Sequence, residues 1–349
     1  MENKFIGNSE YSVSNQTVTA SCPSNIALIK YWGKYANQIP ANPSISYTLN
    51  NCKTNTQLEF FADEDFSVQT FLSDVEEVKF AEKIEKYFKT IEVYLPWILK
   101  GKYIIRTENT FPHSSGIASS ASGFGAIAKA LMQLDQFFTN STTIDLTKAS
   151  FLARLGSGSA CRSLYNGLIV WGETKEVDGS SNEYAVEYPQ EEIHPVFKDF
   201  NDWVLLIHEG QKSVSSTVGH GLMNTNPYAE RRFQEAHENF TTLKSILKSG
   251  DMASFIKLVE HEALTLHAMM MMSDPAFILM KKGTLEVINK IWEFRTETKL
   301  PLFFTLDAGA NVHLLFPTNQ DTAKIETFIT DHLLQHTQKG GVVKDYMKF

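Results

Sequence analysis

PHSSGIASSASG, residues 112–123, crowds small residues and hydroxyl groups into a predicted turn, and a run of good helix formers follows at 124–134. A helix that begins in such a turn points its free N–H groups, and the positive end of its dipole, into the loop. The stretch therefore predicts an anion site, and nucleotide phosphates suit it best. It is not a Walker loop, because no Gly-Lys-Ser/Thr follows the glycines, and the spacing of a dinucleotide loop is absent. A flexible Ser/Gly turn before a core helix is the alternative that these residues leave open.

Composition narrows the class of protein. The chain has 349 residues, of which 43% are hydrophobic and 21% charged, as in an ordinary globular protein. A formal net charge of -8 argues against nucleic acid as the main partner. We expect no signal peptide and no membrane span, because no apolar run approaches the roughly 20 residues that a membrane helix needs. Cys22, Cys52 and Cys161 form no Cys-x-x-Cys pair, which favours a reduced, cytoplasmic enzyme.

Hydrophobic periodicity outlines the order of elements. Strands are predicted at 18–22, 57–61, 103–107, 167–171, 203–208, 302–306 and 312–316. Helices are predicted at 74–94, 124–134, 147–155, 228–247, 252–271, 275–296 and 322–334. Strands do not alternate with single helices, so a Rossmann sheet and a TIM barrel are disfavoured. We predict an α+β fold of two lobes with a break near 180–200.

Two lysines lie four residues apart in NIALIKYWGK, residues 25–34, near the end of the first predicted strand. Lys30 and Lys34 can present two ammonium groups, and Tyr31 a phenol, to one anion. Lysine suits phosphate as a mobile point charge. Solvated lysines on an amphipathic edge are the alternative.

A second glycine- and serine-rich turn, GSGSACRS at 156–163, leads into a predicted buried strand. Its backbone N–H groups can surround an anion, and Arg162 can bind a carboxylate through two parallel hydrogen bonds. A linker has a similar composition, but linkers seldom carry an arginine and run straight into a buried strand.

TLDAGAN, residues 305–311, places Asp307 at the end of an apolar strand just before a glycine turn. Such a carboxylate is a candidate general base or electrostatic group, although an Asx turn that ends the strand explains it equally well. KSVSST at 212–217 offers further hydroxyl groups to an anion. His261, Glu262 and His267 lack the histidine spacing of a zinc helix.

Taken together and in this order, the five motifs resemble the diphosphomevalonate decarboxylases of the GHMP kinase superfamily. The match runs from about residue 17 to 317. NIALIKYWGK and GSGSACRS resemble the decarboxylase branch, whereas the 112–123 loop resembles the whole superfamily. The resemblance implies a GHMP kinase-like fold with a deep cleft between an N-terminal ATP-binding lobe, 1–190, and a C-terminal lobe, 191–349.

The activity that the resemblance implies is ATP- and Mg²⁺-dependent decarboxylation of mevalonate 5-diphosphate to isopentenyl diphosphate. The 3-hydroxyl is phosphorylated first, and phosphate and CO2 are then lost. Decarboxylation of mevalonate 5-phosphate, a mevalonate 3-kinase and a catalytically silent relative remain alternatives. The resemblance further implies a cytoplasmic homodimer whose partners are the small-molecule substrate and ATP, with no nucleic acid and no membrane.

Site residues follow from the resemblance position by position. The residues implied in catalysis are Asp307, Arg162 and Lys30. The residues implied in substrate binding are Asn25, Lys30, Tyr31, Lys34, Ser157, Ser159, Arg162 and Ser216. The residues implied in binding ATP and Mg²⁺ are Gly116, Ser119, Ser120, Ser122 and Gly123, with Ser120 as the Mg²⁺ ligand. The chain departs from the family pattern at Asn42-Pro43-Ser44, at His113-Ser114-Ser115 and at His220, where methionine is frequent.

Overall fold

The computed structural model describes residues 3–62, 64–112, 117–208, 210 and 214–348. Its first seven strands form one sheet, in which the long strand β2 pairs with β1, β5 and β6. All pairs in this sheet are antiparallel except β3 with β5. The strands are β1 (Gln16–Ile29), β2 (Ser44–Phe61), β3 (Ser67–Leu72), β4 (Val75–Glu76), β5 (Lys102–Asn109), β6 (Leu168–Trp171) and β7 (Ala185–Glu187).

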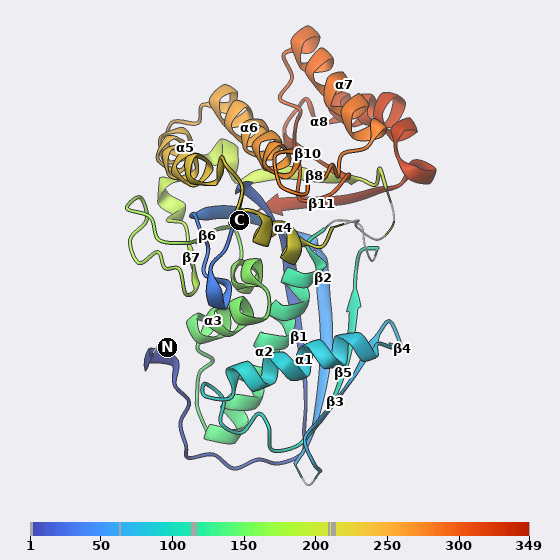
Figure 1. Ribbon diagram of the computed structural model, residues 1–349. Helices are drawn as coiled ribbons and strands as arrows, with labels where there is room; N and C mark the ends of the chain where they lie inside the picture. The colour runs from blue at the N-terminus through green and yellow to red at the C-terminus, as the bar shows by residue number, and fades with distance from the viewer. Residues whose placement is uncertain (1–2, 63, 113–116, 209, 211–213, 349) are drawn as a thin grey trace.

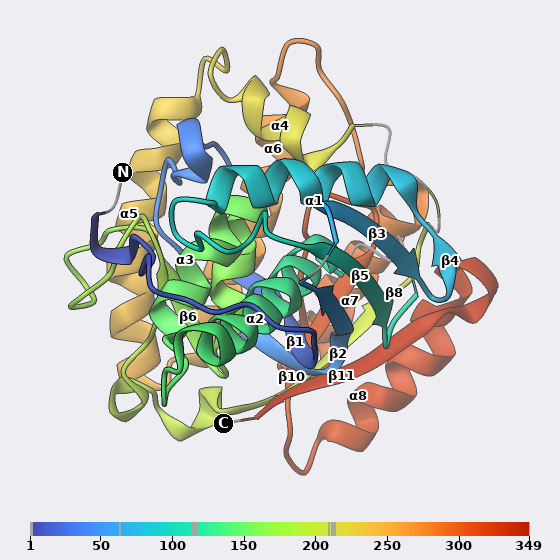
Figure 2. The same cartoon turned by 90° about the horizontal axis from the view of Figure 1, so that it is seen from below.

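Three helices cover one side of this sheet: α1 (Val78–Ile91), α2 (Ser119–Thr139) and α3 (Leu146–Gly156). Figure 2 shows α1 and α2 on the same side of β1 and β2. Large apolar side chains, among them Phe88 and Phe124, fill the space between these layers. A 3-10 turn, Gly158–Leu164, follows α3 and carries Arg162.

The second sheet is antiparallel, with the order β11-β8-β10-β9. Its strands are β8 (Asp199–Leu205), β9 (Phe303–Thr305), β10 (Val312–Pro317) and β11 (Val342–Lys348). The helices of this half are α4 (Ser216–Leu222), α5 (Ala229–Ser249), α6 (Met252–Met271), α7 (Lys282–Thr298) and α8 (Thr322–Phe328). Figure 1 shows α5, α6 and α7 over the second sheet, with α4 beside the first half of the chain.

The two halves share a hydrophobic core. Ile45 and Tyr47 of β2 belong to the same buried cluster as Phe200, Phe240 and Phe255 of the second half. The Tyr47 hydroxyl also donates to the carbonyl oxygen of Phe197 at 2.8 Å. The α+β fold with two lobes, predicted from the sequence, is confirmed, and its lobes are joined by packed side chains as well as by the chain.

Several predicted boundaries shift. The helix predicted at 74–94 begins only at Val78, because residues 75–76 pair with β3 as strand β4. The helix predicted at 275–296 is wrong in its first turns, since α7 begins at Lys282. Helix α2 is longer than predicted at both ends. Over the residues described, no helix has the length and apolar character to cross a membrane.

Candidate active site

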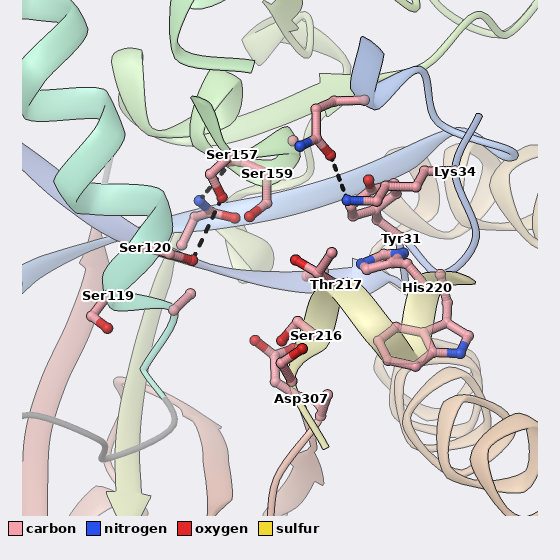
Figure 3. Close-up of a pocket in the computed structure, with 18 of the residues that line it drawn as sticks. Tyr31, Lys34, Ser119, Ser120, Ser157, Ser159, Ser216, Thr217, His220 and Asp307 are labelled. Carbon is pink, nitrogen blue, oxygen red and sulfur yellow. Dashed lines mark hydrogen bonds between the residues drawn. The ribbon is translucent and has the colours of Figure 1, made fainter. Parts of the chain in front are cut away.

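A cavity of about 580 Å³ opens where the sequence motifs converge. Its lining comes from the end of β1, the start of α2, the turn after α3, helix α4 and the loop after β9. Figure 3 shows these side chains facing a common open space: Tyr31, Lys34, Ser119, Ser120, Ser157, Ser159, Ser216, Thr217, His220 and Asp307. Residues that are far apart in the sequence therefore form one polar chamber.

Lys30 and Asp307 form an ion pair inside the cavity. The Lys30 ammonium donates to Asp307 Oδ1 at 3.0 Å, and the Lys30 side chain is 2% exposed while that of Asp307 is 29% exposed. Burial lowers the pKa of Lys30, and the neighbouring Asp307 carboxylate partly offsets this effect. Lys30 thus holds the aspartate in place, while the carboxylate remains accessible from the cavity.

The backbone of Lys30 is fixed by a buried ion pair from the other lobe. Glu262 of α6 accepts from the Lys30 N–H at 2.9 Å, and Arg232 of α5 donates to the Lys30 carbonyl oxygen at 3.3 Å. Arg232 also donates to Glu262 at 3.0 Å, and both side chains are at most 1% exposed. His267 binds the carbonyl oxygen of Asp307 at 3.1 Å. Helices α5 and α6 thereby set the positions of both members of the Lys30–Asp307 pair.

Arg162 is a buried cation, with 3% of its surface exposed at the cavity wall. Its Nε donates to Asn25 Oδ1 at 3.2 Å, and its Nη1 donates to the hydroxyl of Ser44. Within the described part of the chain, no carboxylate lies within ion-pair distance of Arg162. Burial lowers the pKa of this guanidinium. A buried cation with neutral partners is suited to bind an anion that enters the cavity.

The first turn of α2 meets the turn after α3 at one wall of the cavity. Ser119 and Ser120 begin the helix, and the Ser157 hydroxyl donates to Ser120 Oγ at 3.5 Å. No side chain caps the helix at Ala118, so its first N–H groups remain available to an anion. A Cβ atom on Gly123 would meet nothing within 4 Å, which leaves open space beside this turn.

The structure corrects the prediction that Ser122 contacts ATP. Its side chain is buried and shares a hydrogen bond of 2.7 Å with the Thr54 hydroxyl, away from the cavity lining. The hydroxyl joins α2 to β2, so we do not retain it as an ATP contact. Gly116, which was predicted to approach the phosphates, lies outside the described residues.

The opposite wall carries the second lysine and helix α4. Lys34 Nζ donates to Gln38 Oε1 at 2.7 Å, and burial, together with the charge of Lys83, lowers the pKa of Lys34. The Tyr31 hydroxyl is buried without a hydrogen-bond partner among the described residues. A Cβ atom on Gly158 would come within 2.8 Å of that hydroxyl, so glycine is required there.

Several residues of the site escaped the sequence analysis. Ser44 touches Arg162, Lys83 lines the cavity, and Arg232 and Glu262 bind the backbone of Lys30 from the other lobe. The sequence could have indicated Glu262, because it is a carboxylate inside the apolar helix predicted at 252–271. A charge buried there is stable only when it is paired. The ion pair of Glu262 with Arg232 joins residues 30 positions apart, and its hydrogen bond from the Lys30 N–H joins residues 232 positions apart, so neither contact has a local signature.

Both halves of the chain match models of one protein family. Residues 22–183 match the diphosphomevalonate decarboxylase-like N-terminal domain, and residues 203–348 match the mevalonate 5-diphosphate decarboxylase C-terminal domain. The diphosphomevalonate decarboxylase of Saccharomyces cerevisiae is 30% identical over 331 residues, which cover 90% of this chain and 81% of the relative. The chain belongs to the diphosphomevalonate decarboxylase family. The family relative from Schizosaccharomyces pombe is 31% identical over 85% of this chain and 78% of its own length.

Solved structures of the family share the fold. The mevalonate diphosphate decarboxylase of Staphylococcus aureus is 28% identical, with a TM-score of 0.81 over 96% of each chain. MDDEF, solved in complex with MVAPP, AMPPCP and magnesium, is 25% identical, with a TM-score of 0.81 over 96% of this chain and 98% of its own. The resemblance to the decarboxylase family that the five motifs suggested is thus confirmed along the chain.

Proposed function

We propose that this chain converts mevalonate 5-diphosphate and ATP into isopentenyl diphosphate, ADP, phosphate and CO2. Arg162 carries the proposal: it is a buried guanidinium without a carboxylate partner in the described chain, and it lines the same cavity as Asp307 and Lys34. A substrate with a carboxylate, a hydroxyl and a phosphorylated end supplies a partner for each of these groups. The diphosphomevalonate decarboxylase relatives favour the 5-diphosphate over the monophosphate and kinase alternatives.

Asp307 faces the 3-hydroxyl in this proposal, as a base or as an electrostatic partner for that proton. Lys30, held by its ion pair and by Glu262, keeps the Asp307 carboxylate oriented. Phosphoryl transfer depends mainly on positioning and charge neutralisation. A rigidly supported carboxylate at the hydroxyl fits that need.

Arg162 holds the substrate carboxylate during fragmentation. Positive charge builds at C3 as the C3–O bond breaks and phosphate leaves, and the electron pair of the breaking C1–C2 bond forms the C2=C3 double bond as CO2 is released. A very strong grip on the carboxylate would stabilise the ground state and oppose CO2 loss. Asn25 and Ser44 orient the guanidinium through neutral hydrogen bonds.

ATP and Mg²⁺ fit the wall formed by α2. The uncapped helix start and the hydroxyls of Ser119 and Ser120 suit phosphate oxygens. Gly123 does not line this cavity, so its role in close approach rests on the resemblance alone. Among the described residues, no three His, Cys, Asp or Glu side chains gather as a metal site. Mg²⁺ keeps several water ligands and binds substrate phosphates, and we take Ser120 as its protein ligand. When bound, the ion neutralises the charge of the transferring phosphoryl group.

The diphosphate end of the substrate is assigned to the opposite wall. Lys34 supplies the charge, and the Tyr31 hydroxyl, which has no hydrogen-bond partner among the described residues, supplies a donor. Ser157, Ser159 and Ser216 line the same cavity and add hydroxyl groups.

We also propose a cytoplasmic homodimer with lobes at 1–190 and 191–349. Cys22, Cys52 and Cys161 are all buried and unpaired, which suits a reducing compartment. The change from the first sheet to the second, between Glu187 and Asp199, supports the lobe boundary. The homodimer rests on the resemblance, and sedimentation of the purified protein tests it.

Product analysis tests the proposed reaction. Purified enzyme is supplied with Mg-ATP and mevalonate 5-diphosphate, and CO2 and phosphate are measured together, with the 5-monophosphate in parallel. One CO2 and one phosphate per ATP from the diphosphate is the expected result. ADP without CO2 would indicate a 3-kinase, faster turnover of the monophosphate would reassign the substrate, and ATP binding without turnover would indicate a silent relative.

A further inference from the structure

His220 lies inside the proposed site. It is the fifth residue of α4, is 7% exposed and lines the cavity together with Tyr31 and Lys34. Its ring lies against two aromatic rings, with centroid distances of 4.3 Å to Tyr31 and 4.6 Å to Trp32. Figure 3 places it on the same wall as Lys34 and Thr217.

The hydrogen bonds of His220 determine its tautomer. The N–H of Gly33 donates to His220 Nδ1 at 3.0 Å, so Nδ1 is the unprotonated nitrogen. Burial, and next the charge of Lys34, lowers the pKa of His220 to about 3, which keeps the ring neutral near pH 7. The proton of the neutral ring therefore sits on Nε2. Nε2 has no hydrogen-bond partner among the described residues. It is nevertheless not one of the fully buried polar atoms that lack a partner, so Nε2 keeps some accessible surface.

We propose that His220 is a specificity-determining residue at the diphosphate end of the cavity, where its Nε2–H donates a hydrogen bond to a phosphoryl oxygen of the substrate. A methionine at this position can fill the space but cannot donate. The identity of the substrate in this inference rests on the proposed function. The binding of a diphosphate group beside His220 rests on the geometry of the cavity alone.

Inorganic pyrophosphate tests this proposal without requiring turnover. Calorimetric titration is carried out on the wild type, on His220→Met and on His220→Gln, whose amide can accept from Gly33 and still donate to the ligand. We expect the Kd to rise about tenfold or more in His220→Met, as for a lost hydrogen bond to a charged group, and to stay within about threefold in His220→Gln. With mevalonate 5-diphosphate, His220→Met raises KM while kcat changes less than about threefold.

An unchanged pyrophosphate Kd in a folded His220→Met protein, with wild-type ATP affinity, would overturn the proposal and leave His220 as a packing ring. If His220→Met does not fold, the wild type still decides through the imidazole Nε2–H signal in NMR. That signal shifts on adding pyrophosphate if the bond forms, and an unmoved signal contradicts it. A failure of the proposed function would be seen in a separate assay, because the wild-type enzyme would then release no CO2 from mevalonate 5-diphosphate.

Discussion

Asp307 is the residue on which the proposed chemistry depends most. Asp307→Asn keeps the size of the side chain but removes the charge that faces both Lys30 and the substrate hydroxyl. We expect kcat to fall by about 10²–10⁴-fold, with the ATP Kd within about threefold, because the nucleotide is bound at the α2 wall. Steady-state kinetics and nucleotide titration measure the two effects, with the exposed Asp331→Asn as control. Near-normal turnover would remove Asp307 from catalysis.

Arg162 tests whether a buried charge serves binding or stability. Arg162→Met removes a desolvated cation that has neutral partners, so no carboxylate is left buried and unpaired within the described chain. We expect kcat/KM to fall by at least about 100-fold, while the free energy of unfolding changes by no more than about 1–2 kcal/mol in either direction. Urea unfolding measures the change in the free energy of unfolding, and steady-state kinetics measure the change in kcat/KM. A loss of stability as large as that from breaking a buried ion pair would mean that Arg162 is structural.

His220 makes the stability of the protein depend on pH. Its pKa falls from 6.5 in the unfolded chain to about 3 in the fold, so between these values only the unfolded chain binds the proton. The free energy of unfolding therefore falls as pH drops below 6.5, by up to about 1.4 kcal/mol per pH unit. From pH 6.5 to 5 the wild type should lose about 2 kcal/mol more than His220→Gln. Parallel slopes in urea unfolding across this range would contradict the assignment.

At the scale of single residues, the sequence analysis predicted the functional side chains but not the residues that those side chains contact. Arg162 and Asp307 were predicted from charge placed beside glycine turns, and Lys34 from its spacing of four residues to Lys30; all three line the cavity. Ser122 was assigned to ATP because its neighbours are, but helical geometry turns its hydroxyl toward Thr54. The support of Lys30 by Glu262 depends on tertiary packing that no local pattern encodes.

Helices α5 and α6 support the backbone of Lys30 through a buried ion pair, Arg232 with Glu262. Arg232→Met would leave Glu262 charged and buried, and we expect a loss of about 3–5 kcal/mol in the free energy of unfolding. Arg231→Met is the matched control, because that side chain is 58% exposed and pairs with Glu238 on the surface, where the loss should stay below about 1 kcal/mol. Equal losses in the two variants would show that the buried pair has no special role.

Elements with a clear hydrophobic period were predicted well, and those defined by distant pairing were not. The predicted helix at 252–271 coincides with α6. Strand β11, in contrast, was missed, because its mixed polar and apolar sequence becomes a strand only through pairing with β8, some 140 positions earlier in the chain. Strand β4 was taken as the start of a helix for the same reason: its pairing with β3 overrides a weak helical pattern.

The lobes are coupled at the scale of the whole molecule. Asp345 of β11 accepts hydrogen bonds from the backbone N–H groups of Asn50, Asn51 and Cys52, at 3.0, 2.9 and 2.6 Å. These bonds tie the second sheet to the middle of β2, next to the core cluster that both lobes share. The cavity is built from both lobes, so the same contacts hold Asp307 opposite the α2 wall.

This coupling predicts that the lobes do not fold independently. A fragment of residues 1–190 would expose Ile45 and Tyr47, which are at most 1% exposed in the full chain, and would leave the backbone donors at 50–52 without Asp345. We expect the fragment to show no cooperative unfolding in urea, whereas the full chain unfolds in one transition that fluorescence and far-UV circular dichroism report together. Separate transitions in the full chain, or a cooperative one in the fragment, would show that the shared core contributes little to stability. The cavity would then lie between two independently stable domains. The position of Asp307 would depend only on its contacts at the cavity, such as the ion pair with Lys30.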